Sequence, residues 1–115
     1  KQVRDVLHPL DLALLIDRQL NVGRDATKPT TLNVGGGINS ARSLRQLTDW
    51  CASRFGMMTV EADLSPRPFD LPWIVLDSSL AAQHWSWKPS RTTESILDEI
   101  ADHAIRHPDW LKATQ

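Results

Sequence analysis

The sequence predicts one small α+β domain of about four short strands and four helices, spanning residues 1–115. The chain has 115 residues, of which 41% are hydrophobic, which is enough for one core and too little for two ordinary domains. Short apolar runs typical of strands alternate with segments whose apolar residues recur at helical spacing. The sequence shows no internal repeats and no low-complexity tract, which disfavours repeat arrays.

Charge and cysteine content exclude several classes of function. A formal net charge of -1 provides no basic field to hold a nucleic acid or an anionic membrane surface. No apolar run approaches the roughly 20 residues that span a bilayer. Cys51 is the single cysteine, so no intrachain disulfide forms, and this favours the cytoplasm. We therefore expect a cytoplasmic protein without nucleic-acid or membrane partners.

The first elements are an extended segment up to Pro9 and a helix over 12–21. Asp11 is expected to cap this helix by accepting hydrogen bonds from its first amides, and Gly23 to close its last turn. One face of the helix is apolar at Leu12, Leu15, Ile16 and Leu20. Because the sequence opens inside an extended segment, it is expected to be a piece of a longer polypeptide.

A strand over 31–34 is expected next, ended by three glycines at 35–37. The glycine run fits neither the G-x-G-x-x-G pattern nor the P-loop pattern. We therefore expect a turn in which the backbone approaches a neighbouring segment closely, and not a phosphate cradle.

The second helix has the clearest start signal in the chain. Ser43 and Gln46 stand at the spacing of a capping box, and Gly56 ends the helix. Its buried face is predicted to carry Leu44, Leu47, Cys51 and Phe55. Cys51 on this face is expected to be a small buried hydrophobic group and not a nucleophile.

The second half predicts two strands and two helices. Strands are expected at 59–62 and 73–76, separated by an extended proline-rich loop at 66–72. A short helix over about 79–85 is capped by Asp77, Ser78 and Ser79. The last helix begins at Thr92 or Thr93, stops before Pro108 and buries Ile96, Leu97, Ile100, Ala104 and Ile105.

Arg67 is the strongest candidate for a binding residue. It lies between two prolines, which fix the backbone and reduce the entropy lost when a guanidinium clamps a phosphate or carboxylate. The alternative is a loop arginine that pairs with Asp70, since structural ion pairs are common. Arg4, Asp5 and His8 fall at a strand end before a helix, where side chains often line a ligand crevice, although such a pair is also often structural.

Two further groups are weighed against structural roles. His103 and His107 are four residues apart, but the sequence offers no third ligand at a recognised spacing, so no metal site is expected. The five tryptophans suggest either a base-stacking platform or packing in a core and between domains, and packing is favoured because positive charge is lacking.

Five segments in this order resemble the C-terminal part of the extended short-chain dehydrogenase/reductases, which are NAD-dependent nucleotide-sugar epimerases and dehydratases. The likeness covers nearly the whole chain and is closest in appearance to the CDP-paratose 2-epimerase (CDP-tyvelose epimerase) branch, with UDP-galactose 4-epimerases and dTDP-glucose 4,6-dehydratases near it. The segments are 3–11, 33–37, Arg67-Pro68-Phe69-Asp70, Asp77 and Trp85-Ser86-Trp87-Lys88-Pro89.

The resemblance implies roles for particular residues. Arg67 would hold the diphosphate of a CDP- or UDP-sugar, and Arg4 would reach the same anionic region. Asp5, Asn33 and Asp70 would support them. Asp11 matches a helix-starting acid of structural importance. Phe69 stands where the family usually has glycine.

The resemblance also implies what lies elsewhere. Such enzymes bind NAD through a glycine-rich turn and use a Tyr-x-x-x-Lys pair, and this chain contains no tyrosine. We expect a substrate-binding domain without catalytic residues, inactive alone, that packs beside an N-terminal Rossmann half carrying NAD, in an enzyme that epimerises a nucleotide sugar. The enzyme is a possible homo-oligomer. The alternatives are the same domain of a 4,6-dehydratase, decarboxylase or 4-epimerase, and a non-catalytic interaction module.

Overall fold

The fold is built around one short central strand, with which two later segments of the chain pair. The computed structural model describes residues 2–23, 25–61, 63, 65, 68–110 and 112. Its elements are β1 (Val3–Asp5), α1 (Pro9–Val22), a 3₁₀ turn (Ile38–Ser40), β2 (Ala41–Ser43), α2 (Leu44–Phe55), β3 (Trp73–Ile74), α3 (Ser79–Trp85) and α4 (Thr93–Arg106). This mixture of four α-helices with one small sheet confirms the α+β class.

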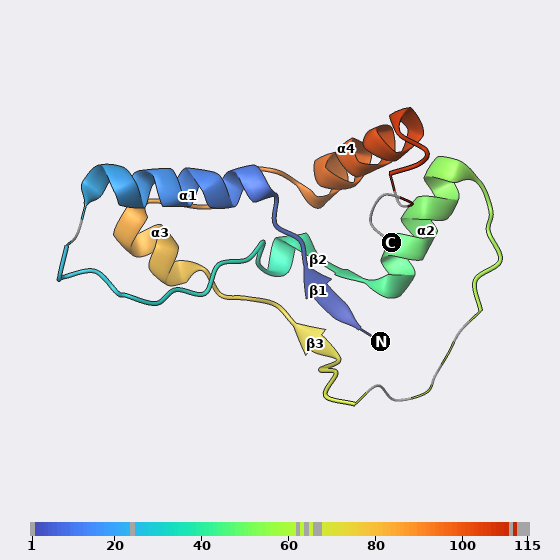
Figure 1. Ribbon diagram of the computed structural model, residues 1–115. Coiled ribbons are helices and arrows are strands. Elements are labelled where there is room, and N and C mark those ends of the chain that lie inside the picture. The colour runs from blue at the N-terminus through green and yellow to red at the C-terminus, as the bar shows by residue number, and fades with distance from the viewer. Residues whose placement is uncertain are drawn as a thin grey trace.

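The sheet has the order β2-β1-β3, so β1 is paired on both sides. β2 runs antiparallel to β1 and places Ala41 opposite Asp5. β3 runs parallel to β1 and places Ile74 opposite Arg4. In Figure 1 the sheet lies between α1 and α3 at one end of the molecule and α2 and α4 at the other.

The predictions of two strands are wrong, and the structure has one strand that the sequence did not predict. The described residues of 31–34 and 59–62 form no strand, and residue 62 lies outside the described part. The strand expected over 73–76 is limited to β3, and it is exposed rather than buried, since Trp73 is 57% exposed. These segments have strand-like sequences, but a strand needs a partner, and β1 is paired instead with β2 at 41–43.

The first helix starts earlier than expected, and Asp11 does not cap it. α1 begins at Pro9, and the cap is His8, whose Nδ1 accepts a hydrogen bond from the Leu10 amide at 3.0 Å. Proline suits the first helical turn because its missing N–H would have no partner there. Asp11 is instead a buried first-turn residue whose carboxylate turns to Ser90 and Arg91.

The second helix confirms the capping box. The Ser43 hydroxyl accepts from the Gln46 amide, and the Gln46 side chain accepts from the Ser43 amide. The helix ends at Gly56, which has φ 95°. Its predicted apolar face is only half covered, because Leu47 and Cys51 are partly buried while Leu44 and Phe55 are exposed.

The last two helices also begin where expected, but the buried positions of α4 differ. Thr92 caps α4 by accepting from the Ser95 amide. Ile96 and Ala101 are buried, whereas Ile100 and Ile105 are about half exposed. The predicted buried face of α4 is therefore covered only in part.

The core is small and lies where α1 meets α3. Leu15, Ala81 and Trp87 are almost fully buried, and the Trp87 indole N–H donates to the Asp11 carbonyl oxygen at 2.7 Å. This confirms core packing for one tryptophan. The Cα radius of gyration is 17.3 Å, compared with about 13 Å for a compact domain of 100 residues. Within the described ranges, no helix is long and apolar enough to cross a membrane.

Candidate functional site

The candidate site begins on one face of β1, where Arg4 meets the end of the proline-rich loop. Arg4 Nη2 donates to Asp70 Oδ1 at 2.7 Å, and the Gln2 side-chain amide donates to the other carboxylate oxygen. Gln2 and Arg4 lie two residues apart, so their side chains share one face of the extended segment. The Val3 amide bonds to the Pro72 carbonyl at 2.9 Å and holds the loop end beside β1.

The Arg4–Asp70 ion pair is accessible to solvent. The Arg4 side chain is 41% exposed, and that of Asp70 is 21% exposed. Pairs with this exposure contribute about 0–1 kcal/mol to stability, because water and salt screen them. Loss of this pair would therefore cost little stability.

Asp5 lies on the opposite face of β1, because successive side chains of a strand alternate. Its Oδ2 accepts from the Gly37 amide at 3.0 Å and from the Leu76 amide at 3.2 Å. Ser78 adds a second link, since its hydroxyl bonds to both the amide and the carbonyl of Gly35. The Asp5 carboxylate thus steadies the adjoining loops, while the ion pair that the structure records for Arg4 is with Asp70.

The glycine run is packed against the chain's own backbone. A Cβ at Gly36 would lie 1.9 Å from the Val6 carbonyl oxygen, and one at Gly35 would lie 2.2 Å from Asp5 Oδ2. Gly35 and Gly36 are both buried. This confirms the expected close approach of the backbone to a neighbouring segment.

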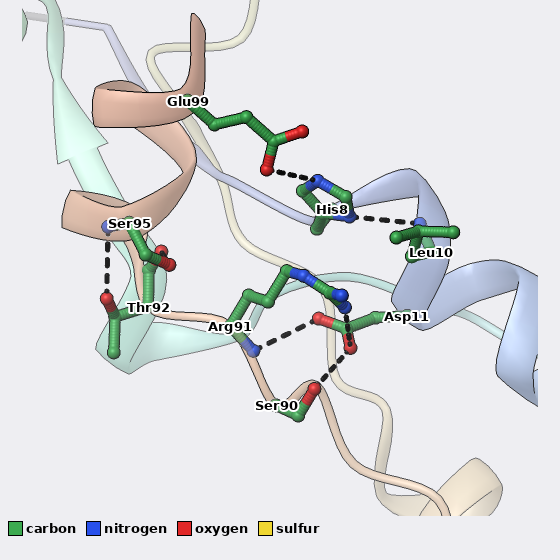
Figure 2. A network of polar contacts seen from close by, with 8 residues as sticks. All are labelled: His8, Leu10, Asp11, Ser90, Arg91, Thr92, Ser95 and Glu99. Atoms are coloured by element: carbon green, nitrogen blue, oxygen red, sulfur yellow. Dashed lines mark hydrogen bonds and ion pairs between the residues drawn. The ribbon is translucent and has the colours of Figure 1, made fainter. Parts of the chain in front are cut away.

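A polar network ties the start of α1 to α4, as Figure 2 shows. Asp11 accepts from the Ser90 hydroxyl at 2.6 Å and from the Arg91 amide at 3.2 Å, and it pairs with the Arg91 guanidinium at 3.3 Å. His8 Nε2 lies 3.1 Å from Glu99 Oε2. Because His8 Nδ1 accepts from a backbone amide, the ring proton belongs on Nε2 and is donated to Glu99.

The pKa of Asp11 reflects this network. Burial alone would raise the pKa of the Asp11 carboxyl, but the hydrogen bonds from Ser90 and Arg91, with the charge of Arg91, lower it below its ordinary value. The Asp11 side chain is 1% exposed and that of Arg91 is 33% exposed, so the Asp11 carboxylate is closed to a ligand. This agrees with the structural role that the resemblance implies for Asp11.

A groove of about 500 Å³ lies between the glycine run and the segment that leads into α4. Part of its polar lining bonds to other residues of the chain. The buried Thr93 hydroxyl donates to the Ser40 carbonyl at 3.2 Å, and Arg42 pairs with Glu94 at 2.5 Å, which lowers the pKa of Glu94. Arg4 and Asp70 do not line this groove.

The predicted site residues divide into four groups. Arg4 and Asp70 are brought together, Asp5 lies on the other face of β1, and Arg67 lies outside the described residues. Asn33 is exposed and makes no side-chain hydrogen bond with the described part of the chain. The pairing proposed between Arg67 and Asp70 therefore stays a prediction, while Asp70 has Arg4 as a partner.

Sequence reasoning missed Gln2 and explained Phe69 only in part. Gln2 could have been found from its spacing to Arg4, since residues i and i+2 of a strand share a face. Phe69 has φ 61°, in the left-handed region. Glycine adopts this conformation without strain, which accounts for the glycine that the resembled family carries at this position.

The structure also locates the paired histidines and the cysteine that the sequence singled out. The rings of His103 and His107 are 4.6 Å apart. Across residues 2–23, 25–61, 63, 65, 68–110 and 112, no group of three or more histidine, cysteine or acidic side chains is arranged to hold a metal ion. Cys51 is partly buried on α2.

Comparison with known proteins gives one relative. The chain is 28% identical, over 115 aligned residues, to UDP-glucose 4-epimerase from Caenorhabditis elegans, and the alignment covers 96% of this chain and 32% of that protein. The chain is similar to the C-terminal third of that epimerase. No protein-family model matches the sequence, and no solved structure gives a significant match.

This likeness supports the resemblance to nucleotide-sugar epimerases at the level of the broad group. The relative is a 4-epimerase, so it favours the 4-epimerase alternative over the CDP-paratose 2-epimerase branch. The chain spans about a third of the length of the relative that it matches.

Proposed function

We propose that this chain is the nucleotide-sugar-binding part of an NAD-dependent epimerase that acts on a UDP-sugar at C4. The observation that carries the proposal is the Arg4–Asp70 contact at 2.7 Å. It places a solvent-accessible guanidinium at the end of the loop that follows Arg67 in the sequence. The likeness to a UDP-glucose 4-epimerase over 96% of the chain supports the same reading.

The proposed work of these residues is to neutralise a pyrophosphate. Arg4 exchanges Asp70 for a phosphate oxygen, and Arg67 supplies a second guanidinium. Arginine suits this task because its planar donors match two anionic oxygens at once. Asp70 and Gln2 hold Arg4 in place when no substrate is bound.

The described residues do not fit NAD. Gly35 lies against the Asp5 side chain and Gly36 against the Val6 carbonyl, and the chain has no tyrosine to act as acid or base. We therefore assign NAD, the catalytic base and the remaining wall of the cleft to another part of a longer polypeptide. The residues of this chain bind and orient the substrate for that part.

The proposal is tested by calorimetry on the full-length protein with UDP-glucose, UDP-galactose and a CDP-sugar. We expect the UDP-sugars to bind. Arg4→Ala and Arg67→Ala should each weaken binding by about 1.5–3 kcal/mol, the scale of a hydrogen bond to a charged group. Arg106→Ala is the control, because Arg106 is exposed at the end of α4 and its side chain bonds to the Asp102 carbonyl of the same helix.

Other results of these measurements would overturn or change the proposal. Unchanged affinity in both arginine variants would overturn the diphosphate role. Preference for the CDP-sugar would favour a CDP-paratose 2-epimerase instead. Turnover to a dehydrated or decarboxylated product would indicate a dehydratase or a decarboxylase. Absence of binding to any nucleotide sugar would favour an interaction module.

A further inference from the structure

The helix α4 is attached to the rest of the chain in two different ways along its length. Its first turns are anchored by buried contacts, since Thr93 is 1% exposed and donates to the Ser40 carbonyl, and Ile96 is 5% exposed. Just before the helix, the Arg91 amide donates to the buried Asp11 carboxylate at 3.2 Å. The start of α4 is therefore held by groups that water and salt do not reach.

The second half of α4 buries much less. Ala101 is the only buried residue of 99–106, all of which the structure describes, and Ile100 and Ile105 are about half exposed. An alanine side chain removes little apolar surface from water, so the hydrophobic effect contributes little to holding this half. Its attachment must come mainly from polar contacts.

Two acidic side chains supply these contacts. Asp102 Oδ1 lies 2.9 Å from Arg54 Nη2 on α2, and Glu99 Oε2 lies 3.1 Å from His8 Nε2 at the start of α1. The Arg54 guanidinium lies 5.7 Å from the centre of the Phe55 ring, which helps to fix its position. The Asp102 and Glu99 side chains are 57% and 64% exposed, so dissolved ions can screen both contacts.

We propose that residues 99–106 form an ionic strap, which closes on α1 and α2 in low salt and frays back to the anchored start of α4 in high salt. Salt at about 1 M shortens the range of charge attraction to about 3 Å, and the burial of Ala101 does not compensate for the weakened pairs. Ionic strength then sets how far the end of the molecule that carries α2 and α4 is closed (Figure 1). This inference goes beyond the proposed function and does not depend on it.

Opening of the strap changes the surface that the protein presents. A hollow of about 250 Å³ is lined by residues of the strap and by Trp110 in the turn that follows it. The Trp110 ring meets the His103 ring edge-on, with 5.7 Å between their centres. Because the helical turns of the strap bring these groups together, the hollow exists only while the strap is closed.

The test is hydrogen–deuterium exchange of the protein in sodium chloride at about 0.01 M and about 1 M, where the screening length is about 30 Å and about 3 Å. We expect the protection factors of amides 100–106 to fall about tenfold in high salt, as in local opening of a weakly held segment. Those of amides 96–98 should stay unchanged, because the start of α4 is anchored by buried contacts.

Variants of the charged pairs sharpen the test. Asp102→Asn and Glu99→Gln together should lower the protection of 100–106 in low salt and remove most of its salt dependence. Asp98→Asn is the matched control, since Asp98 is an exposed acid of the same helix for which the described part of the chain provides no ion pair. The exchanged pair Arg54→Asp with Asp102→Arg should restore protection in low salt.

Three results would overturn the strap. They are equal protection of 100–106 in both salts, equal effects of Asp98→Asn and of the double variant, and loss of protection at 96–98 together with 100–106, which would mean that the whole helix releases as one unit. If the double variant fails to fold, the salt comparison on the unmodified protein decides alone.

Discussion

Asp11 joins the first turn of α1 to the segment that precedes α4. Its carboxylate is almost fully buried and accepts hydrogen bonds from the Ser90 hydroxyl, the Arg91 amide and the Arg91 guanidinium. A buried charge is tolerated only when it is paired and hydrogen-bonded. The residue therefore matters for folding, and its position at a helix start does not reveal the partners, which lie about 80 residues away.

Asp11→Asn tests this role. The amide keeps one acceptor but loses the charge, so we expect the free energy of unfolding at pH 7 to fall by about 1.5–3 kcal/mol. Urea titration followed by tryptophan fluorescence measures it. Asp17→Asn on the same helix is the control, since Asp17 is exposed and should change stability by less than about 0.5 kcal/mol. Equal effects of the two variants would contradict the role.

The same carboxylate predicts a pH dependence. The pKa of Asp11 is lowered in the folded state, so its contribution is complete above the ordinary carboxyl pKa of about 4. It is lost as the pH falls from there through the lower folded pKa. Thermal melts between pH 7 and pH 2 should show a smaller acid loss in Asp11→Asn than in the wild type, and parallel curves would contradict the prediction.

Phe69 is a fully exposed aromatic residue in a left-handed conformation. Phe69→Gly should raise the free energy of unfolding by about 0.5–1 kcal/mol, because the strain of a left-handed residue with a Cβ is about 1–2 kcal/mol and glycine's extra chain entropy offsets part of the gain. Phe69→Ala keeps the strain and should be close to neutral. Denaturant titration of both variants measures the difference, and equal stabilities would refute the strain.

At the scale of elements, the glycine run fixes how closely β1 can approach its neighbours. Gly36→Ala would place a methyl group 1.9 Å from the Val6 carbonyl oxygen, and backbone cannot move aside as a flexible side chain does. We expect a loss of about 1–3 kcal/mol or more. Gly23→Ala, which meets no atom within 4 Å but has φ 72°, should lose only about 1 kcal/mol. Denaturant titration that ranks them the other way would contradict the packing.

The elements differ in how well the sequence predicted them. Elements fixed by contacts between residues close in the sequence were predicted better than those fixed by contacts between distant residues. Ser43 and Gln46 are three residues apart and contact each other, so the start of α2 was predictable. β2 exists because 41–43 pairs with β1, nearly 40 residues earlier, and no local pattern encodes that pairing. The Arg4–Asp70 contact is of the same kind, so sequence reasoning named both residues as candidates without pairing them.

At the scale of the molecule, the chain is extended and exposes much apolar surface. Its dimensions are 53 × 35 × 27 Å. Many large hydrophobic side chains outside the small core are exposed, including Leu10, Leu14, Ile38, Met58 and Leu71. Contiguous exposed apolar surface of this kind commonly marks interaction sites.

We therefore expect the 115-residue chain alone to self-associate weakly and without one fixed stoichiometry. Sedimentation velocity over a hundredfold range of concentration should show a weight-average sedimentation coefficient that rises with concentration. Leu20→Lys should reduce the rise more than Met57→Lys, because Leu20 lies on α1 near two other exposed apolar residues, Leu12 and Ile16, whereas Met57 lies beyond the end of α2. A concentration-independent monomer would contradict this expectation.

Residues 44–72 leave and rejoin the sheet at almost one point. The Leu44 amide bonds to the Gln2 carbonyl at 3.1 Å, and the Val3 amide bonds to the Pro72 carbonyl at 2.9 Å. Since neighbouring positions of one strand hold both ends, the register of the sheet does not depend on how many residues lie between them. Each doubling of such an insertion costs only about 0.6 kcal/mol in closure entropy, so evolution is free to remodel the part of the chain that contains Arg67 without rebuilding the scaffold that carries Arg4.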